Sequence, residues 1–190
     1  MINNRKGFTI VELLIVIVVI GVLVAIAIVA YTGVQARAND TKIRSAANQL
    51  EKSIMAWAVQ TGSATIPGGL GSTVPPSANG CVDGVSGWFS NTTGYVCAAE
   101  DHLVAQKVIP EGFSAKLPPN TYYGNPPNGR LSLMLYKCTS APGRYALFWT
   151  LQRPTAEETE SINSVVTTCG NTQVRDTWGM RSGKIFTLPS

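Results

Sequence analysis

Glu12 is the residue whose position most needs a chemical explanation, because it lies at the edge of a long apolar run. The run covers residues 13 to 30 and contains 18 residues without a charge. A carboxylate in apolar surroundings is costly when it is isolated but is tolerated when it pairs with an ammonium group. An acid inside a membrane segment is therefore a candidate functional residue that needs a partner. We expect Glu12 to pair with a cation.

Other residues that could perform catalysis or bind a metal do not form a recognisable motif. His102 is the only histidine, and no serine lies in a GxSxG context. The sequence has no Walker loop, no GxGxxG and no HExxH pattern. The acids Glu157, Glu158 and Glu160 lie on one predicted helix, where a solvated face near the helix start is a better interpretation than a metal site. We expect no enzymatic activity, no metal and no cofactor.

The four cysteines all follow the apolar run, and an even number on one side of a membrane indicates two disulfide bonds in an oxidising compartment. The sequence allows three pairings. We favour Cys81 with Cys97 and Cys138 with Cys169, because pairing of nearest neighbours closes the shortest loops. Four buried free thiols are the alternative. A metal site is less favoured because the sequence contains no CxxC spacing.

The apolar run is long enough to cross a membrane as a helix, since about 20 residues span the roughly 30 Å of hydrocarbon. Many of its residues are Val or Ile, which favour strands in water. In lipid only a helix satisfies the backbone groups of a single segment. Its Leu, Ile and Val side chains supply about −6 kcal/mol of insertion free energy, against at most about +3 kcal/mol for a central acid. Glu12 therefore does not prevent insertion.

Two interpretations of residues 1–31 compete. In the first, Arg5 and Lys6 begin a secretory signal that is removed at the small residues near the end of the run. This interpretation leaves Glu12 unexplained and requires an apolar region longer than the usual length of about 7–15 residues. In the second, the chain is cut before the apolar run, which stays attached to the mature protein.

A resemblance to a known family favours the second interpretation. Residues 7–14, Gly7-Phe8-Thr9-Ile10-Val11-Glu12-Leu13-Leu14, resemble the cleavage and methylation motif of type IV prepilins and type II secretion pseudopilins. The resemblance covers about residues 1–60. It implies that a membrane-embedded prepilin peptidase cuts between Gly7 and Phe8 and methylates the new amine of Phe8. That amine would supply the cation for Glu12 of an incoming subunit, which sets the axial register of the filament.

The resemblance implies a structural subunit of an extracellular type IV pilus filament that serves adhesion, motility or DNA uptake. Its partners would be further copies and other pilins, prepilin peptidase, the assembly machinery of the cytoplasmic membrane, and membrane lipid before assembly. The N-terminus would lie in the cytoplasm before assembly. One departure is Val29, where many pilins carry a proline, so the resemblance gives no basis for local melting of the helix there.

Two other functions are open. The chain could be a pseudopilin of a type II secretion system, or a membrane-tethered extracellular binding domain that does not polymerise. Nucleic acid is not a favoured partner of the head, because no stripe of Lys and Arg is present. The net charge of +4 would also fall to +2 once Arg5 and Lys6 leave with the leader, since 13 Lys and Arg would then face 11 Asp and Glu.

Beyond the apolar run the chain stays helical in pattern but becomes amphipathic. Apolar residues recur at steps of four and three, which is the spacing of a helix with one buried face. These residues are Ile43, Ala47, Leu50, Ile54 and Trp57. We expect one helix from about Phe8 to Thr61, capped by Gly62.

The remaining sequence predicts a small antiparallel sheet packed on the amphipathic half of this helix, which is an α+β fold. Residues 62–80 indicate a loop, and Cys81 and Cys97 would enclose a surface loop that contains Phe89. The expected elements are a helix over 101–108, a hairpin of strands 130–137 and 144–151, a helix from the capping box at Thr155 to about residue 164, and a strand over 184–188. The expected regions are a leader peptide (1–7), a transmembrane and polymerisation helix (8–31), an amphipathic helix (32–61) and a globular head (62–190).

Overall fold

The computed structural model describes residues 8–66, 86–89, 99–118, 132–177 and 179–189. The chain divides into two compact units, residues 1–38 and residues 39–190. Helix α1 (Ile10–Thr61) supplies residues to both units. The predicted helix therefore begins two residues later than expected. Its end is confirmed at Thr61, and Gly62 follows with a φ of 64° while the Ser63 amide donates to the Ala58 carbonyl oxygen, as in a Schellman cap.

In the first unit, the described residues are a short N-terminal segment and the apolar half of α1. The large apolar side chains from Ile10 to Val34 are exposed over about half to four-fifths of their surface. The helix is long and apolar enough to cross a membrane. A helix that is apolar on all sides must be covered by lipid or by other protein chains, because contact between this apolar surface and water is unfavourable.

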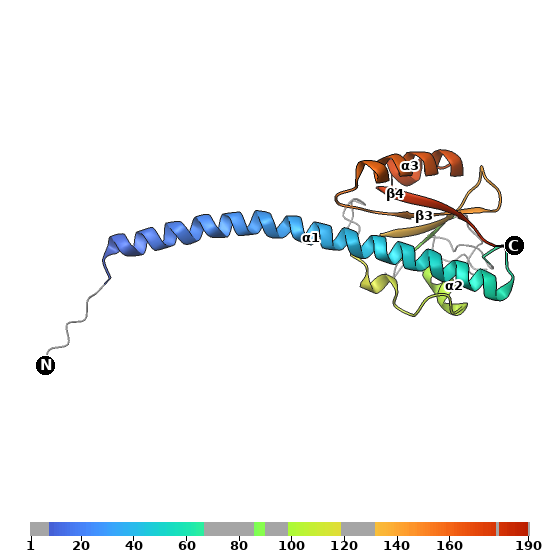
Figure 1. The fold of residues 1–190 in the computed structure, drawn as a ribbon, viewed down its shortest axis with the longest axis horizontal. Helices are drawn as coiled ribbons and strands as arrows, with labels where there is room; N and C mark the ends of the chain where they lie inside the picture. Colours follow the sequence, from blue (N-terminus) through green and yellow to red (C-terminus); the bar gives the residue numbers. More distant parts are fainter. Residues whose placement is uncertain (1–7, 67–85, 90–98, 119–131, 178, 190) are drawn as a thin grey trace, which may run out of the picture. The chain divides into compact units, whose positions relative to one another are not determined.

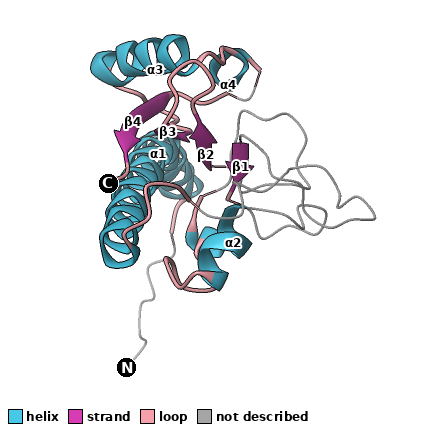
Figure 2. Ribbon diagram, turned by 90° about the vertical axis from the view of Figure 1, so that its right-hand side faces the viewer, coloured by secondary structure: helices cyan, strands magenta, loops and turns pink. Residues whose placement is uncertain are grey.

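The second unit contains a four-stranded antiparallel sheet in the order β1-β2-β3-β4 (Figure 2). Figure 1 shows this sheet beside the second half of α1. The strands are β1 (Ser86–Trp88), β2 (Leu133–Lys137), β3 (Arg144–Trp149) and β4 (Ser182–Thr187). The other elements are α2 (Ala99–Ala105), the 3-10 helix η1 (Ser114–Lys116), α3 (Ala156–Cys169) and α4 (Gln173–Asp176). The predicted α+β architecture, with a long helix on a small antiparallel sheet, is confirmed.

Helices cover both faces of the sheet, as Figure 2 shows. Leu133 and Leu135 of β2 pack with the buried stripe of α1 on one face. Met134 and Tyr136 of the same strand pack beneath α3 on the other face. Because both faces are covered, β2 and β3 each contain four consecutive buried residues instead of an alternation of buried and exposed ones. The layer formed by α3 was not predicted.

The buried stripe of α1 begins at Asp40, three residues before the predicted Ile43, and ends at Ala58 instead of Trp57. It consists of Asp40, Ile43, Ala47, Leu50, Ile54 and Ala58. Trp57 was expected at its end but is only partly buried, because the spacing of four from Ile54 places Ala58 against the sheet. This stripe attaches the amphipathic half of the helix to the sheet within the second unit.

Several element boundaries differ from the predictions. The helix expected over 101–108 covers Ala99–Ala105, the last strand covers Ser182–Thr187, and α3 continues to Cys169 instead of ending near residue 164. The surface loop predicted around Phe89 is wrong for that residue, because Phe89 follows β1 and is fully buried against Phe113. The region 67–80, Cys81 and Cys97 lie outside the described residues.

Candidate processing and assembly site

The start of α1 is organised by a reciprocal pair of hydrogen bonds between Thr9 and Glu12. The amide nitrogen and the hydroxyl of Thr9 both donate to Oε2 of Glu12 at 2.8 Å. The amide nitrogen of Glu12 donates to Oγ1 of Thr9 at 3.3 Å. Thr9 is thus the N-cap residue and Glu12 the third residue of the helix, which is a capping box. The arrangement explains why the helix begins at Ile10 and not at Phe8.

The capping box leaves part of the Glu12 carboxylate available. Both bonds from Thr9 end on Oε2, and no described residue donates a hydrogen bond to Oε1. The carboxylate also lies at the positive end of the helix dipole, where a negative charge is favoured. Glu12 therefore has one oxygen fixed by its own chain and a second oxygen that can accept from another donor.

Of the two residues at the predicted cleavage point, the structure describes only Phe8. Phe8 precedes the N-cap and is 84% exposed. Gly7 lies outside the described residues. Sequence reasoning missed the part played by Thr9, although the T-x-x-E spacing that marks a capping box is present at Thr9 and Glu12 as it is at Thr155 and Glu158.

Residues 2–28 match the family model described as the prokaryotic N-terminal methylation motif. This chain carries a prepilin-type N-terminus. The motif is the hallmark of type IV pilins and pseudopilins, so it implies processing by prepilin peptidase and assembly into pilin filaments. It also indicates a membrane-anchored precursor. No solved structure matches the chain.

In the second unit (residues 39–190), which is called the head from here on, a buried acid holds α1 to the segment that leads into α3. Asp40 is 1% exposed. Its Oδ1 accepts from the amide of Gln152 and its Oδ2 from the amide of Arg153, both at 2.8 Å. A buried carboxylate is tolerated when such charge-assisted bonds satisfy it. These two bonds fix the position of the 152–153 segment on α1.

A second contact joins α1 to the first turn of α3. Nε of Arg44 donates to Oε1 of Glu158 at 2.6 Å, and a second guanidinium nitrogen donates to Oε2 at 3.0 Å. The hydrogen bond from Arg44 is the main cause that lowers the pKa of Glu158, and the same bond raises the pKa of Arg44. Glu158 also closes the predicted capping box with Thr155. The pair therefore links α3 to α1 around the edge of the sheet.

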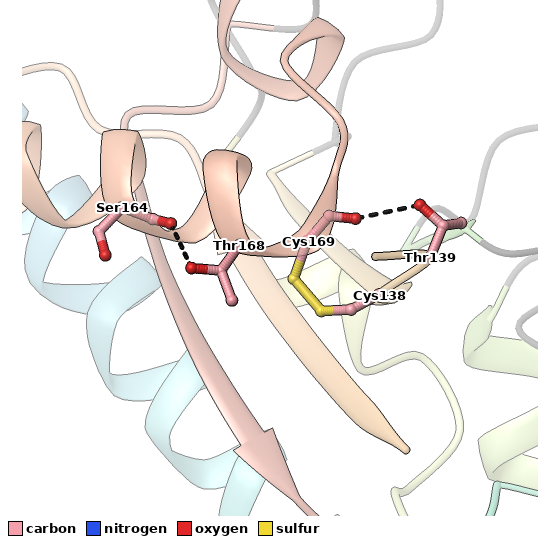
Figure 3. The surroundings of a disulfide bond; sticks show 5 residues. All are labelled: Cys138, Thr139, Ser164, Thr168 and Cys169. Atoms are coloured by element: carbon pink, nitrogen blue, oxygen red, sulfur yellow. Dashed lines mark hydrogen bonds between the residues drawn. A yellow bond between two sulfur atoms is a disulfide. The ribbon is translucent and has the colours of Figure 1, made fainter. Parts of the chain in front are cut away.

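A disulfide bond joins Cys138, just after β2, to Cys169 at the end of α3 (Figure 3). This is one of the two pairings favoured from the sequence. The backbone oxygen of Cys169 also accepts hydrogen bonds from the amide and the hydroxyl of Thr139. Covalent and hydrogen bonds thus hold the end of α3 to the sheet. The pairing of Cys81 with Cys97 stays a prediction, because both residues lie outside the described part of the chain.

Within the described ranges, no group of three or more His, Cys, Asp or Glu side chains could hold a metal ion. The acids predicted to form a solvated face of α3 have different environments. Glu157 and Glu160 are exposed, whereas Glu158 is partly buried by its contact with Arg44. The solvated-face interpretation is therefore wrong for Glu158, because a cation from α1 reaches it.

Proposed function

We propose that this chain is a structural subunit of an extracellular type IV pilus, cut after Gly7 and methylated on the amine of Phe8 by prepilin peptidase. The observation that carries the proposal is the match to the methylation motif at the start of a helix whose apolar side chains are exposed on all sides. Such a helix is stable in lipid before assembly and can be covered by other copies in a filament. The N-terminus would face the cytoplasm until the subunit leaves the membrane.

Cleavage changes the chemistry at the helix start. Water adds across the Gly7–Phe8 peptide bond, which releases the leader as a carboxylate and leaves an amine on Phe8. The amine carries a positive charge when protonated and lies close in sequence to the acid at position 12. A glycine before the cut places no side chain near the bond that the peptidase must reach.

The second proposed contact joins two copies of the chain. Oε2 of Glu12 is occupied by Thr9, so Oε1 is the oxygen that can accept from the Phe8 amine of a neighbouring subunit. In apolar surroundings an ammonium and a carboxylate attract each other far more strongly than in water. Unpaired, each is costly. The contact would therefore favour one axial register between neighbouring helices over registers that leave both charges without a partner.

The direct test is mass and N-terminal analysis of protein sheared from cells that make filaments. The proposal predicts a chain that begins at methylated Phe8. A mature chain that begins near residue 28, with the apolar segment discarded, would refute it. The same mass and N-terminal analysis of unprocessed protein from the membrane fraction gives the control.

A variant pair tests the contact itself. Glu12→Val should leave the protein in the membrane and still processed, but should reduce assembled filament about tenfold or more, because the neighbour's amine loses its partner. Thr32→Val is the matched control, since it also replaces a polar side chain on α1 with an apolar one and removes only a bond to the carbonyl oxygen of Val29. Normal filament yield from Glu12→Val would contradict the pairing.

Two alternatives predict different results in the same cells. A type II secretion pseudopilin predicts that secretion of exoproteins depends on this chain and that long surface fibres are absent. A tethered binding domain predicts that an unrelated transmembrane helix can replace residues 8–30 without loss of activity. For a pilus subunit this exchange should abolish assembly.

A further inference from the structure

Unpaired charges of opposite sign lie on opposite faces of the head. On the α1 face, Lys42 and Lys116 line a groove of about 420 Å³ between α1 and the segment that contains η1. Phe113 and Leu117 contribute apolar side chains to this groove. Both lysines are exposed, and neither forms an ion pair within the described ranges. This surface is called the basic groove below.

The other face of the head presents α3. This helix contains three acids and no Lys or Arg. Glu158 is neutralised by Arg44 of the same chain. Glu157 and Glu160 are exposed and form no ion pair with the side chains that the structure describes. Because they are three residues apart on one helix, their side chains lie on the same side of it. Figure 2 shows α3 on the side of the sheet away from α1.

We propose that the basic groove of one subunit binds the Glu157 and Glu160 face of α3 from a second copy in the filament. The inference rests on the proposed function and adds a contact between heads to the contact between N-terminal helices. A two-fold dimer brings the same surface of each copy together, which would place like charges in contact. Complementary surfaces on opposite faces instead favour a head-to-tail contact, which leaves each subunit with a free surface for the next copy and so builds a filament.

A second copy fits the basic groove better than nucleic acid. A nucleic-acid surface needs a stripe of cations with aromatic platforms for bases. The groove instead combines two separated lysines with the polar side chains Ser45 and Gln49, which suits a polar helix face. In a filament the helix α3 of a neighbour is also held close, so its effective concentration is high. Exposed ion pairs add little affinity but select orientation and register.

The test reverses the charges on each face in the full-length chain, in cells that process and assemble it. Lys42→Glu with Lys116→Glu makes the basic-groove variant, and Glu157→Lys with Glu160→Lys makes the α3 variant. Each should reduce sheared filament about tenfold relative to membrane-bound subunit, because like charges then face each other at every contact. The combined fourfold variant has the original net charge and should restore filament to within about twofold of the unaltered protein.

The control reverses two exposed cations elsewhere on the head. Lys137→Glu with Arg144→Glu makes the same change in net charge as the basic-groove variant but lies on the β2–β3 hairpin. It should leave filament yield unchanged. Protease resistance of the membrane-bound heads checks that each variant folds.

The outcomes are distinct. Restoration only in the fourfold variant supports the contact. Loss of filament in the basic-groove variant alone means that the groove binds something other than α3, such as an anionic lipid or a nucleic acid, and overturns the inference. Equal loss in the control, or no restoration in the fourfold variant, also overturns it. In these cases filaments of the unaltered protein that begin at Phe8 would still support the pilus proposal. Absence of such filaments would refute both.

Discussion

Replacing Asp40 with asparagine should destabilise the head while it leaves the membrane segment intact. Asp40 accepts two hydrogen bonds from the amides of Gln152 and Arg153, each at 2.8 Å, and is 1% exposed. Asn offers one acceptor oxygen in the same shape. Its amino group would point a donor at a donor, so one of the two bonds is lost and the other no longer involves a charge.

The size of the effect follows from the number and type of these bonds. A hydrogen bond to a charged group contributes about 1.5–3 kcal/mol, and a buried amide left without an acceptor adds a penalty. Gln152 is only partly buried and Arg153 is exposed, so water can replace part of the loss. We therefore expect Asp40→Asn to lower the free energy of unfolding by about 3 kcal/mol, which corresponds to a fall in Tm of about 6–12 °C for a unit of this size.

The assay is thermal unfolding of the full chain in detergent, followed by circular dichroism, with hydrogen exchange of the Gln152 and Arg153 amides as a local measure. The control is Asp176→Asn. It makes the same chemical change in an exposed ion pair with Arg175, where we expect little change in the unfolding temperature, because water screens exposed charges. If both variants unfold at the same temperature and the two amides keep their protection, the reasoning about Asp40 is wrong.

Three other changes test the contacts around α3. The hydrogen bond from Arg44 lowers the pKa of Glu158 below its ordinary 4.5, so this stabilisation is present above that pH and is lost as the pH falls through the lowered pKa. The Tm of Glu158→Gln should therefore lie below that of the unaltered protein at pH 7, and the two should converge as the pH is lowered through the pKa of Glu158. Replacing both Cys138 and Cys169 with serine should cost about 3–4 kcal/mol in a denaturant titration, because the bond closes a separation of 31 residues. Gly170→Ala should cost about 2 kcal/mol in the same titration, since Gly170 has a φ of 80° and a methyl group would meet side chains of the β2–β3 turn. A loss below about 0.5 kcal/mol in either case would contradict these contacts.

The sequence predicted the long helix well because its signals are local. Apolar composition, spacing of three and four, and a glycine at the end all depend on near neighbours along the chain. Asp40 was missed although it lies three residues before Ile43 and so continues the buried stripe. Acids are assumed to be exposed unless a partner is known. Here the partners are two backbone amides more than 100 residues away, which no local pattern reveals.

The sheet was predicted only in part, for a related reason. The runs in β2 and β3 are continuously apolar, which indicates strands buried on both faces. That signal was available and implies a second covering layer. No local pattern shows which helix covers the second face of the sheet, since α3 is held there by the Cys138–Cys169 bond and by the ion pair of Glu158 with Arg44. Strand β1, with three residues, forms by pairing with distant β2 and has no pattern of its own.

The site at the helix start was predicted from its resemblance to a family, and physical reasoning extends it. Asp40 and Glu12 are both acids on α1 that need hydrogen-bond donors. Both oxygens of Asp40 find donors within the same chain. Glu12 receives its two bonds from Thr9 on one oxygen. The apolar surface that follows it is not covered by any described part of the chain.

The same rule that explains Asp40 therefore predicts a second molecule at Glu12. A carboxylate in an apolar environment must have its charge compensated. Of these two acids, only Asp40 has donors from the described chain on both of its oxygens. On the proposed function, the apolar helix surface around Glu12 would also be covered, first by lipid and then by protein. Another copy of this chain would provide both, because after the proposed cleavage it would carry an amine at Phe8 and an apolar helix behind it. Polymerisation, as proposed, would thus satisfy the acid and the apolar surface together.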